Sequence, residues 1–97
     1  MEVKVRFFAN LREIVNKREQ TLTFPENGKV TVNKVLKTLT QQYGKAFTEY
    51  VYDGKTGQPK SFLQFLVNGI STATLNGLET ELKGGDVLAI LPPVGGG

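Results

Sequence analysis

The sequence predicts an α+β domain in which one main helix packs across a mixed sheet of about five strands. Two observations carry this prediction: one stretch has a helical spacing of apolar residues, and shorter stretches on both sides of it alternate as strands do. A length of 97 residues suits a single domain with one core. The 39% of apolar residues is ordinary for a globular chain, so we expect a folded domain.

The first part of the chain predicts a pair of strands joined by a longer connection. Residues 2–8 alternate between apolar and charged side chains, which is typical of a strand buried on one face. Residues 19–24 alternate in the same way, and the turn-forming segment 25–28 ends them. Between the two strands, Leu11 and Ile14 in a polar stretch predict a short helical turn.

Residues 31–43 give the clearest helix. Thr31 suits the N-cap, because its hydroxyl accepts a hydrogen bond from a free amide of the first turn. Gly44 stands where a left-handed residue would end the helix. The apolar face follows the i, i+3, i+4, i+7 spacing of an amphipathic helix and consists of Val32, Val35, Leu36, Leu39 and Tyr43.

A short second helix over 46–51 and an exposed loop over 53–59 are expected next. The sequence Gly54-Lys55-Thr56 in this loop is like the end of a phosphate-binding loop, but the glycine required five residues earlier is absent. We therefore interpret the segment as an ordinary surface loop.

The last part of the chain predicts three more strands. Residues 62–67 are strongly β-forming, and Asn68-Gly69 is the preferred dipeptide of a tight hairpin, with residues 70–74 as the return strand. Residues 87–91 form the last strand. The order of elements places the first and last strands side by side, parallel, in the centre of the sheet, which is the β-grasp arrangement. We expect residues 1–94 to form this domain.

Composition excludes several classes of function. The chain has no cysteine and no histidine, so nucleophilic triads and the usual metal ligands are absent, and we expect neither an enzyme nor a metal site. The acidic pair Glu79 and Glu81 is interpreted as a solvated surface. The longest apolar run has five residues, so no membrane association is expected, and the chain is predicted to be cytoplasmic.

The net charge of +3 is unevenly spread. Residues 1–48 carry nine Lys or Arg and four acids, a balance of +5, whereas residues 49–97 carry three and five, a balance of −2. A weakly basic front half suits an acidic partner. No cluster of bases with interleaved aromatic residues occurs, so we do not expect nucleic-acid binding.

The C-terminal segment is the strongest functional signal. Gly95, Gly96 and Gly97 have no side chains, so they form a slim, flexible tail. Pro92 and Pro93 stiffen the base of this tail, because proline restricts its own backbone and favours an extended chain. A stiff base and a thin tip suit the delivery of the Gly97 carboxylate into a narrow channel of another protein. A frayed, idle terminus is the alternative.

A second candidate feature is an apolar outer face of the sheet. If Leu88 and Ile90 point to the helix, their neighbours on the last strand point away from it. Either these residues form an exposed patch beside the tail or the segment 45–61 folds over them. The members of the predicted partner interface are Phe62, Leu66, Val87 and Leu91.

With these residues in hand, the chain resembles the group of ubiquitin-like proteins that contains the molybdopterin synthase small subunit and the thiazole sulfur carrier. The resemblance runs nearly from end to end. The elements that carry it are Phe8-Ala9-Asn10-Leu11-Arg12-Glu13, Val67-Asn68-Gly69, Leu82, Gly85-Asp86, Pro92-Pro93-Val94 and Gly96-Gly97.

The resemblance implies a non-catalytic sulfur carrier. An E1-like adenylating enzyme, similar to ubiquitin-activating enzymes, would use ATP to convert the Gly97 carboxylate to an acyl adenylate, and sulfur from a sulfurtransferase would then leave a thiocarboxylate. In the molybdopterin branch, the tail inserts into the large subunit of molybdopterin synthase, and Gly95 and Gly96 allow its passage. The chain itself would bind no cofactor.

Two alternatives use the same activated glycine. A ubiquitin-like modifier would be joined to lysines of target proteins, and a thiazole or tRNA type of carrier would deliver sulfur to another acceptor. Sequence alone does not separate them, because all share one tail and one activation step. The loop 53–60 is somewhat long for the group and affects the choice of partner more than the chemistry.

Overall fold

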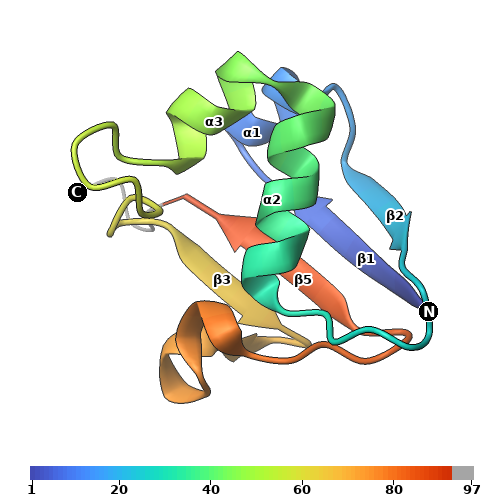
Figure 1. Cartoon of the computed structure of the whole chain (residues 1–97). Coiled ribbons are helices and arrows are strands. Elements are labelled where there is room, and N and C mark those ends of the chain that lie inside the picture. The colour runs from blue at the N-terminus through green and yellow to red at the C-terminus, as the bar shows by residue number, and fades with distance from the viewer. Residues whose placement is uncertain (93–97) are drawn as a thin grey trace.

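The sheet has the predicted β-grasp topology, with its five strands in the order β2-β1-β5-β3-β4 (Figure 1). The computed structural model describes residues 1–92 of the chain. Its central strands β1 and β5 are parallel, and every other neighbouring pair in the sheet is antiparallel. The strands are β1 (Glu2–Phe7), β2 (Glu19–Thr23), β3 (Gln64–Val67), β4 (Ile70–Ser71) and β5 (Val87–Leu91).

One main helix, α2 (Val32–Tyr43), crosses one face of the sheet, as predicted (Figure 1). Its N-cap is Thr31, whose side chain accepts a hydrogen bond from the Lys34 amide at 3.2 Å. Gly44 ends the helix with a positive φ of 76°, but its ψ of −143° lies outside the left-handed helical region. The reason is that Gly44 is also the N-cap of the next helix, so the chain must turn at this residue.

The core lies between α2 and the sheet. The aliphatic residues of the predicted α2 face and the predicted inward residues of the two central strands are buried, and none is more than 1% exposed, whereas Tyr43 is half-buried. Tyr43 closes one end of this layer, where its ring meets the ring of Phe7 edge to face at 6.4 Å. The completely buried residues of these three elements are Val3, Val5, Phe7, Val32, Val35, Leu36, Leu39, Leu88 and Ile90.

Four shorter elements close the ends of the two layers. They are the helices α1 (Asn10–Val15) and α3 (Lys45–Val51) and the 3₁₀ turns η1 (Thr72–Thr74) and η2 (Gly77–Glu79). The first two confirm the predicted helical segments. α3 packs against both α1 and α2, and within residues 1–92 no helix is long and apolar enough to cross a membrane.

The predicted return strand is present but shorter than the expected 70–74, because only Ile70 and Ser71 pair with β3. The Ser71 hydroxyl accepts a hydrogen bond from the Ala73 amide at 3.2 Å, and the Thr74 hydroxyl donates to the Ser71 carbonyl at 2.8 Å. These local bonds favour a 3₁₀ turn over a strand. The strand predicted over 62–67 also starts later, at Gln64, after a turn in which the Leu63 amide donates to the Lys60 carbonyl.

The Thr31 cap leads to a first prediction. Thr31→Ala should lower the free energy of unfolding by about 1 kcal/mol, because it leaves the Lys34 amide without its intramolecular acceptor. The measurement is urea unfolding followed by circular dichroism. Thr38→Ala is the matched control on the same helix: its hydroxyl only donates to the Lys34 carbonyl, so its removal should change stability little. Equal losses in both variants would contradict the capping role.

Candidate functional site: the end of the last strand and the outer sheet face

The last strand of the sheet leads directly to the candidate site. β5 lies between β1 and β3 in the sheet centre and ends at Leu91. Pro92 follows and is half-buried, so the predicted tail base begins at the edge of the folded body. Pro93 and the predicted tail residues Gly95, Gly96 and Gly97 lie outside the described residues.

An apolar strip lies on the sheet face opposite α2. We call it the outer strip and define it as Leu66, Val87, Ala89 and Leu91. The inward residues Leu88 and Ile90 are buried under α2, so strand alternation turns the residues between and beside them outward. Leu66 pairs with Ala89 across the sheet, which joins β3 to the strip. All four members are half-buried.

Phe62 belongs to the same end of the sheet but not to a strand. It precedes β3, whose first residue Gln64 pairs with Leu91, so it lies near the end of β5. Its side chain is 50% exposed, and the Lys60 ammonium is 5.9 Å from the centre of its ring. An exposed phenylalanine beside an apolar strip extends the surface that a partner protein can cover.

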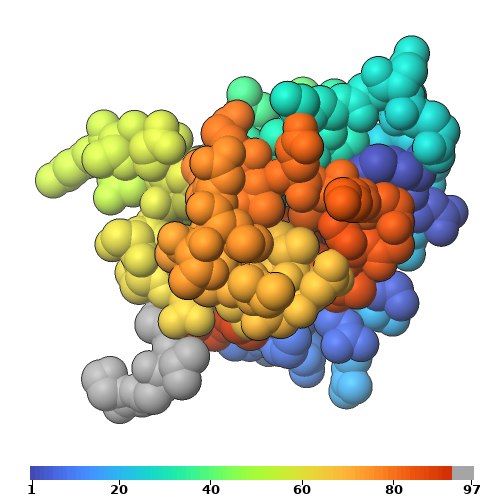
Figure 2. Space-filling model, turned by 90° about the horizontal axis from the view of Figure 1, so that it is seen from below, coloured from blue at the N-terminus to red at the C-terminus, as the bar shows by residue number. Residues whose placement is uncertain are grey.

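The segment 45–61 leaves this surface open. Its loop folds toward α2, where Gln58 and Pro59 line a hollow together with Lys37 and Thr40. In Figure 2 the loop (yellow-green) lies on the upper side of the molecule with α2, whereas β3 and β5 lie toward the lower side. The structure therefore favours the exposed patch over the covered one.

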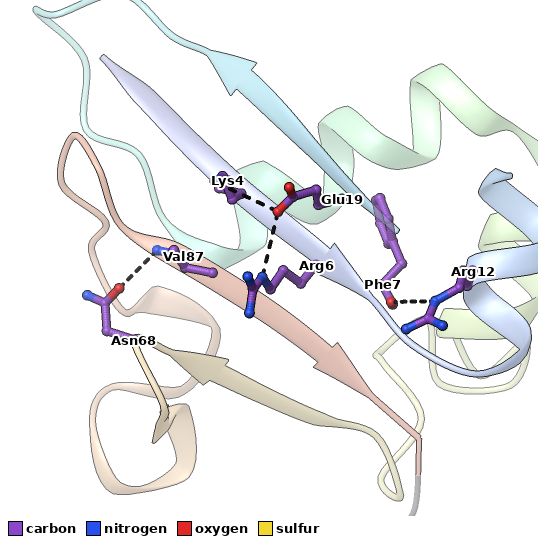
Figure 3. Close-up of polar contacts among 7 residues, drawn as sticks. All are labelled: Lys4, Arg6, Phe7, Arg12, Glu19, Asn68 and Val87. Atoms are coloured by element: carbon purple, nitrogen blue, oxygen red, sulfur yellow. Dashed lines mark hydrogen bonds and ion pairs between the residues drawn. The ribbon is translucent and has the colours of Figure 1, made fainter. Parts of the chain in front are cut away.

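A side-chain clamp fixes the start of β5 (Figure 3). The Asn68 amide oxygen accepts a hydrogen bond from the Val87 amide at 3.0 Å, and the Asn68 amide nitrogen donates to Asp86 Oδ1 at 3.0 Å. Asn68 and Gly69 have φ values of 50° and 83°, which confirms the predicted tight hairpin. The turn thus holds β5 in register with β3 and sets the position of the outer strip.

Three arginines were missed as candidate site residues by sequence reasoning. Arg6, Arg12 and Arg18 together line one hollow, which we call the arginine pocket, and its other lining residues are Phe7, Phe8 and Glu19. Two features of the sequence pointed toward them: the excess of positive charge in residues 1–48, and the alternation in residues 2–8 that turns Arg6 away from the core. The sequence did not reveal that α1 and the bend before β2 bring the guanidinium groups of Arg12 and Arg18 to the same place.

Among residues 1–92, no group of His, Cys, Asp or Glu side chains is arranged to hold a metal ion. Glu79 and Glu81 are exposed, and Glu81 pairs with Lys29 at 3.1 Å, as expected for acidic side chains on a solvated surface.

Burial raises the pKa of the Tyr52 phenol, although a hydrogen bond with Thr40 works in the opposite direction. This phenol therefore stays neutral near pH 7.

The Asn68 clamp leads to a second prediction. Asn68→Gly keeps the positive φ but removes both side-chain hydrogen bonds, so stability should fall by about 1 kcal/mol. The Val87 amide should also exchange its hydrogen faster, as measured by NMR. Asn27→Gly is the matched control, because Asn27 is also exposed and also precedes a glycine. Unchanged exchange at Val87 would contradict the clamp.

Comparison with known proteins identifies one matching family and three similar proteins. A model of the ThiS family matches residues 5–97. Small archaeal modifier protein 3 of Haloferax volcanii is 33% identical over 97 residues, which is 100% of both chains. A protein of Archaeoglobus fulgidus described as a proposed sulfur carrier is 36% identical over 69 residues, or 71% of this chain and 76% of that one. The solution structure of small archaeal modifier protein 1 from Methanosarcina acetivorans superimposes with a TM-score of 0.83 at 37% identity, covering 99% of this chain and 96% of that one.

Proposed function

The chain belongs to the ThiS family of small ubiquitin-like proteins, and from this premise we propose that it carries activated sulfur on the carboxylate of Gly97. Members of this family are carriers and not enzymes, so the chemistry is supplied by partners. The observation that carries the proposal is the extent of the match: the family model reaches residue 97 and so includes the glycine tail. The similarity to an archaeal modifier protein also extends over the full length of both chains and so includes the glycine tail, which supports a role for this tail.

Activation begins with an E1-like adenylating enzyme and ATP. The Gly97 carboxylate attacks the α-phosphorus of ATP, pyrophosphate leaves, and an acyl adenylate results. A sulfurtransferase then supplies sulfur as hydrosulfide, which attacks the carbonyl carbon, displaces AMP and leaves a thiocarboxylate. A free carboxylate is a poor acceptor for such an attack because it lacks a leaving group, and the adenylate provides one.

The tail allows the carboxylate to enter a partner. Gly95 and Gly96 have no Cβ atoms, so the channel that receives them needs to be only as wide as the backbone. Pro92 and Pro93 restrict the backbone where the tail leaves the body, which lowers the entropy lost on insertion.

The final acceptor that we propose is a pterin precursor in molybdopterin biosynthesis. This step requires a large synthase subunit into which the tail inserts, and the resemblance of the tail and of the Phe8–Glu13 element to the molybdopterin branch supports it. The site of action would be the cytoplasm, where ATP-dependent activation takes place.

A second candidate function is protein modification. The names of two relatives, both archaeal modifier proteins, favour it specifically. In this reaction a lysine ε-amine of a target protein attacks the activated Gly97 carbonyl, AMP leaves, and an isopeptide bond forms. Both functions need the same adenylate, so one chain is able to serve both.

The surface that meets the activating enzyme is, in this proposal, the outer strip together with Phe62. It is apolar, partly exposed and adjacent to the tail base. Apolar residues at the centre of an interface contribute most of its binding energy when water is excluded from them.

The mass of the intact chain provides the third prediction. Incubation with ATP, the activating enzyme and a sulfur donor should raise this mass by the difference between sulfur and oxygen, and fragmentation should locate the change at Gly97. Lysines of other proteins that carry residues 84–97 of this chain after tryptic digestion would support modification, because Lys83 is the last cleavage site.

Two variants serve as controls for this prediction. Deletion of Gly96 and Gly97 should abolish the mass change, and one alanine added after Gly97 should also abolish it, since the new carboxylate lies one residue beyond the reacting position. Normal activation of either variant would contradict the proposed role of Gly97.

The fourth prediction concerns the outer strip. Leu91→Glu should leave the chain folded, because Leu91 faces away from the core, yet reduce kcat/KM of adenylation about tenfold by placing a charge in the interface. ATP–pyrophosphate exchange measures the rate and circular dichroism checks the fold. Gln41→Glu, an equal change of charge on the exposed side of α2, is the control. Equal rates for the two variants would exclude the outer strip from the interface.

A further inference from the structure

The arginine pocket has more positive charge than the structure uses. Its lining contains three guanidinium groups and one carboxylate, that of Glu19. This carboxylate already pairs with Arg6 Nε at 3.6 Å and with Lys4 Nζ at 3.8 Å (Figure 3). Within residues 1–92, Arg12 and Arg18 form no ion pair, so the pocket has an excess of cationic hydrogen-bond donors.

Arg12 is held in place without a counterion. Its side chain is half-buried, its Nε lies 3.4 Å from the Phe7 carbonyl oxygen as a long hydrogen bond, and its guanidinium stands 5.9 Å from the centre of the Phe8 ring. A guanidinium that is already oriented loses less conformational entropy when it binds a carboxylate. These contacts therefore prepare Arg12 to receive an anionic group.

The pocket lies at the strand end from which the tail departs. β1 and β5 are parallel, and Phe7 pairs with Ile90. Phe8, the next residue after β1, therefore lies at the same end of the sheet as Leu91, the last residue of β5. Figure 3 shows the ends of both strands on one side of the view, with Arg12 beside them. A protein that encloses the tail must approach this edge and bring its own surface close to the arginines.

We propose that Arg6, Arg12 and Arg18 form a docking site for acidic side chains of the enzyme that activates the tail. This inference rests on the proposed function for the identity of the partner. A guanidinium binds a carboxylate through two parallel hydrogen bonds, which fixes the orientation of the two proteins as well as attracting them. The outer strip provides apolar contact area, and the arginine pocket determines how the activating enzyme is oriented on the chain.

The size of the hollow favours a side chain over a small molecule. Its volume is about 240 Å³, whereas sites for small ligands commonly have about 300–1,000 Å³. Two of its three arginines, Arg6 and Arg18, are exposed at its rim, as expected for groups that meet a second protein surface.

The test compares two double variants in adenylation by the activating enzyme, and it is the fifth prediction. Arg12→Gln with Arg18→Gln should raise the KM for the carrier about tenfold while kcat at saturation stays near the wild-type value, because docking is impaired and the chemistry is not. Lys34→Gln with Lys37→Gln removes the same charge from the exposed side of α2 and should change KM by less than about twofold. Equal effects of the two pairs would overturn the proposal.

The dependence of KM on salt concentration distinguishes docking from a purely structural role of the arginines. The wild-type KM should rise with sodium chloride, and this dependence should be weaker in the arginine variant. Because Arg12 also contacts the Phe7 carbonyl, Arg18→Gln alone and Arg12→Lys serve as folded alternatives. Arg12→Lys keeps the charge but loses the planar fork, so an intermediate KM is expected, and a wild-type KM in both variants would overturn the proposal.

A probe without the enzyme separates this inference from the proposed function. The intact isotope-labelled chain is titrated with hexaglutamate peptide and, in a second arm, with inorganic phosphate. Peptide-induced NMR shifts at Phe8, Arg12 and Arg18 that disappear in the arginine variant would support acidic docking even if no adenylate forms. Preference for phosphate, or peptide binding only after deletion of Gly96 and Gly97, would assign the pocket to another occupant and overturn the proposal.

Discussion

The parallel pairing of β1 and β5 in the middle of the sheet is the constraint on which the rest of the molecule depends. β5 is hydrogen-bonded on both sides, and Leu88 and Ile90 lie almost completely buried beneath α2. Strand alternation then leaves no freedom for the neighbouring side chains: Val87, Ala89 and Leu91 must face the opposite side. Parallel pairing also means that β5 ends where β1 ends. The packing of the core thus determines both the outer strip and the point at which the tail leaves the body.

Two unlike surfaces result at this strand end. The apolar outer strip runs along β5 and β3, whereas the cationic side chains of Lys4 and Arg6 project from β1 on the same face, and Arg6 is itself part of the arginine pocket. An apolar contact is not directional, so it would tolerate several orientations of a partner. Charged groups are more selective, because an orientation that leaves a charge without an opposite charge has a less favourable binding free energy. A carrier whose reactive atom lies at the end of a thin tail needs that selection, because a small tilt of the body displaces the carboxylate.

Sequence reasoning predicted the parts of the fold that follow from periodicity. The alternation in β1 and the spacing of the α2 apolar face fixed which residues face the core, and Asn68-Gly69 identified the hairpin. The same reasoning overestimated the length of the return strand, because hydrogen bonds of the Ser71 hydroxyl and carbonyl favour a 3₁₀ turn directly after β4. The arginine pocket was missed for a different reason. Its members lie on three separate elements, and no pattern along the chain encodes their meeting.

The geometry also constrains the order of events in the proposed function. The Leu91 end of the outer strip, the arginine pocket and the tail base lie at one strand end, so a protein that encloses the tail reaches all three. We therefore expect the proposed activating enzyme and the proposed final sulfur acceptor to compete for one surface and to bind in turn. Because the carrier must leave the first before it reaches the second, very slow dissociation would halt the cycle, and an interface built from a short apolar strip and exposed charges suits the moderate affinity that this exchange requires.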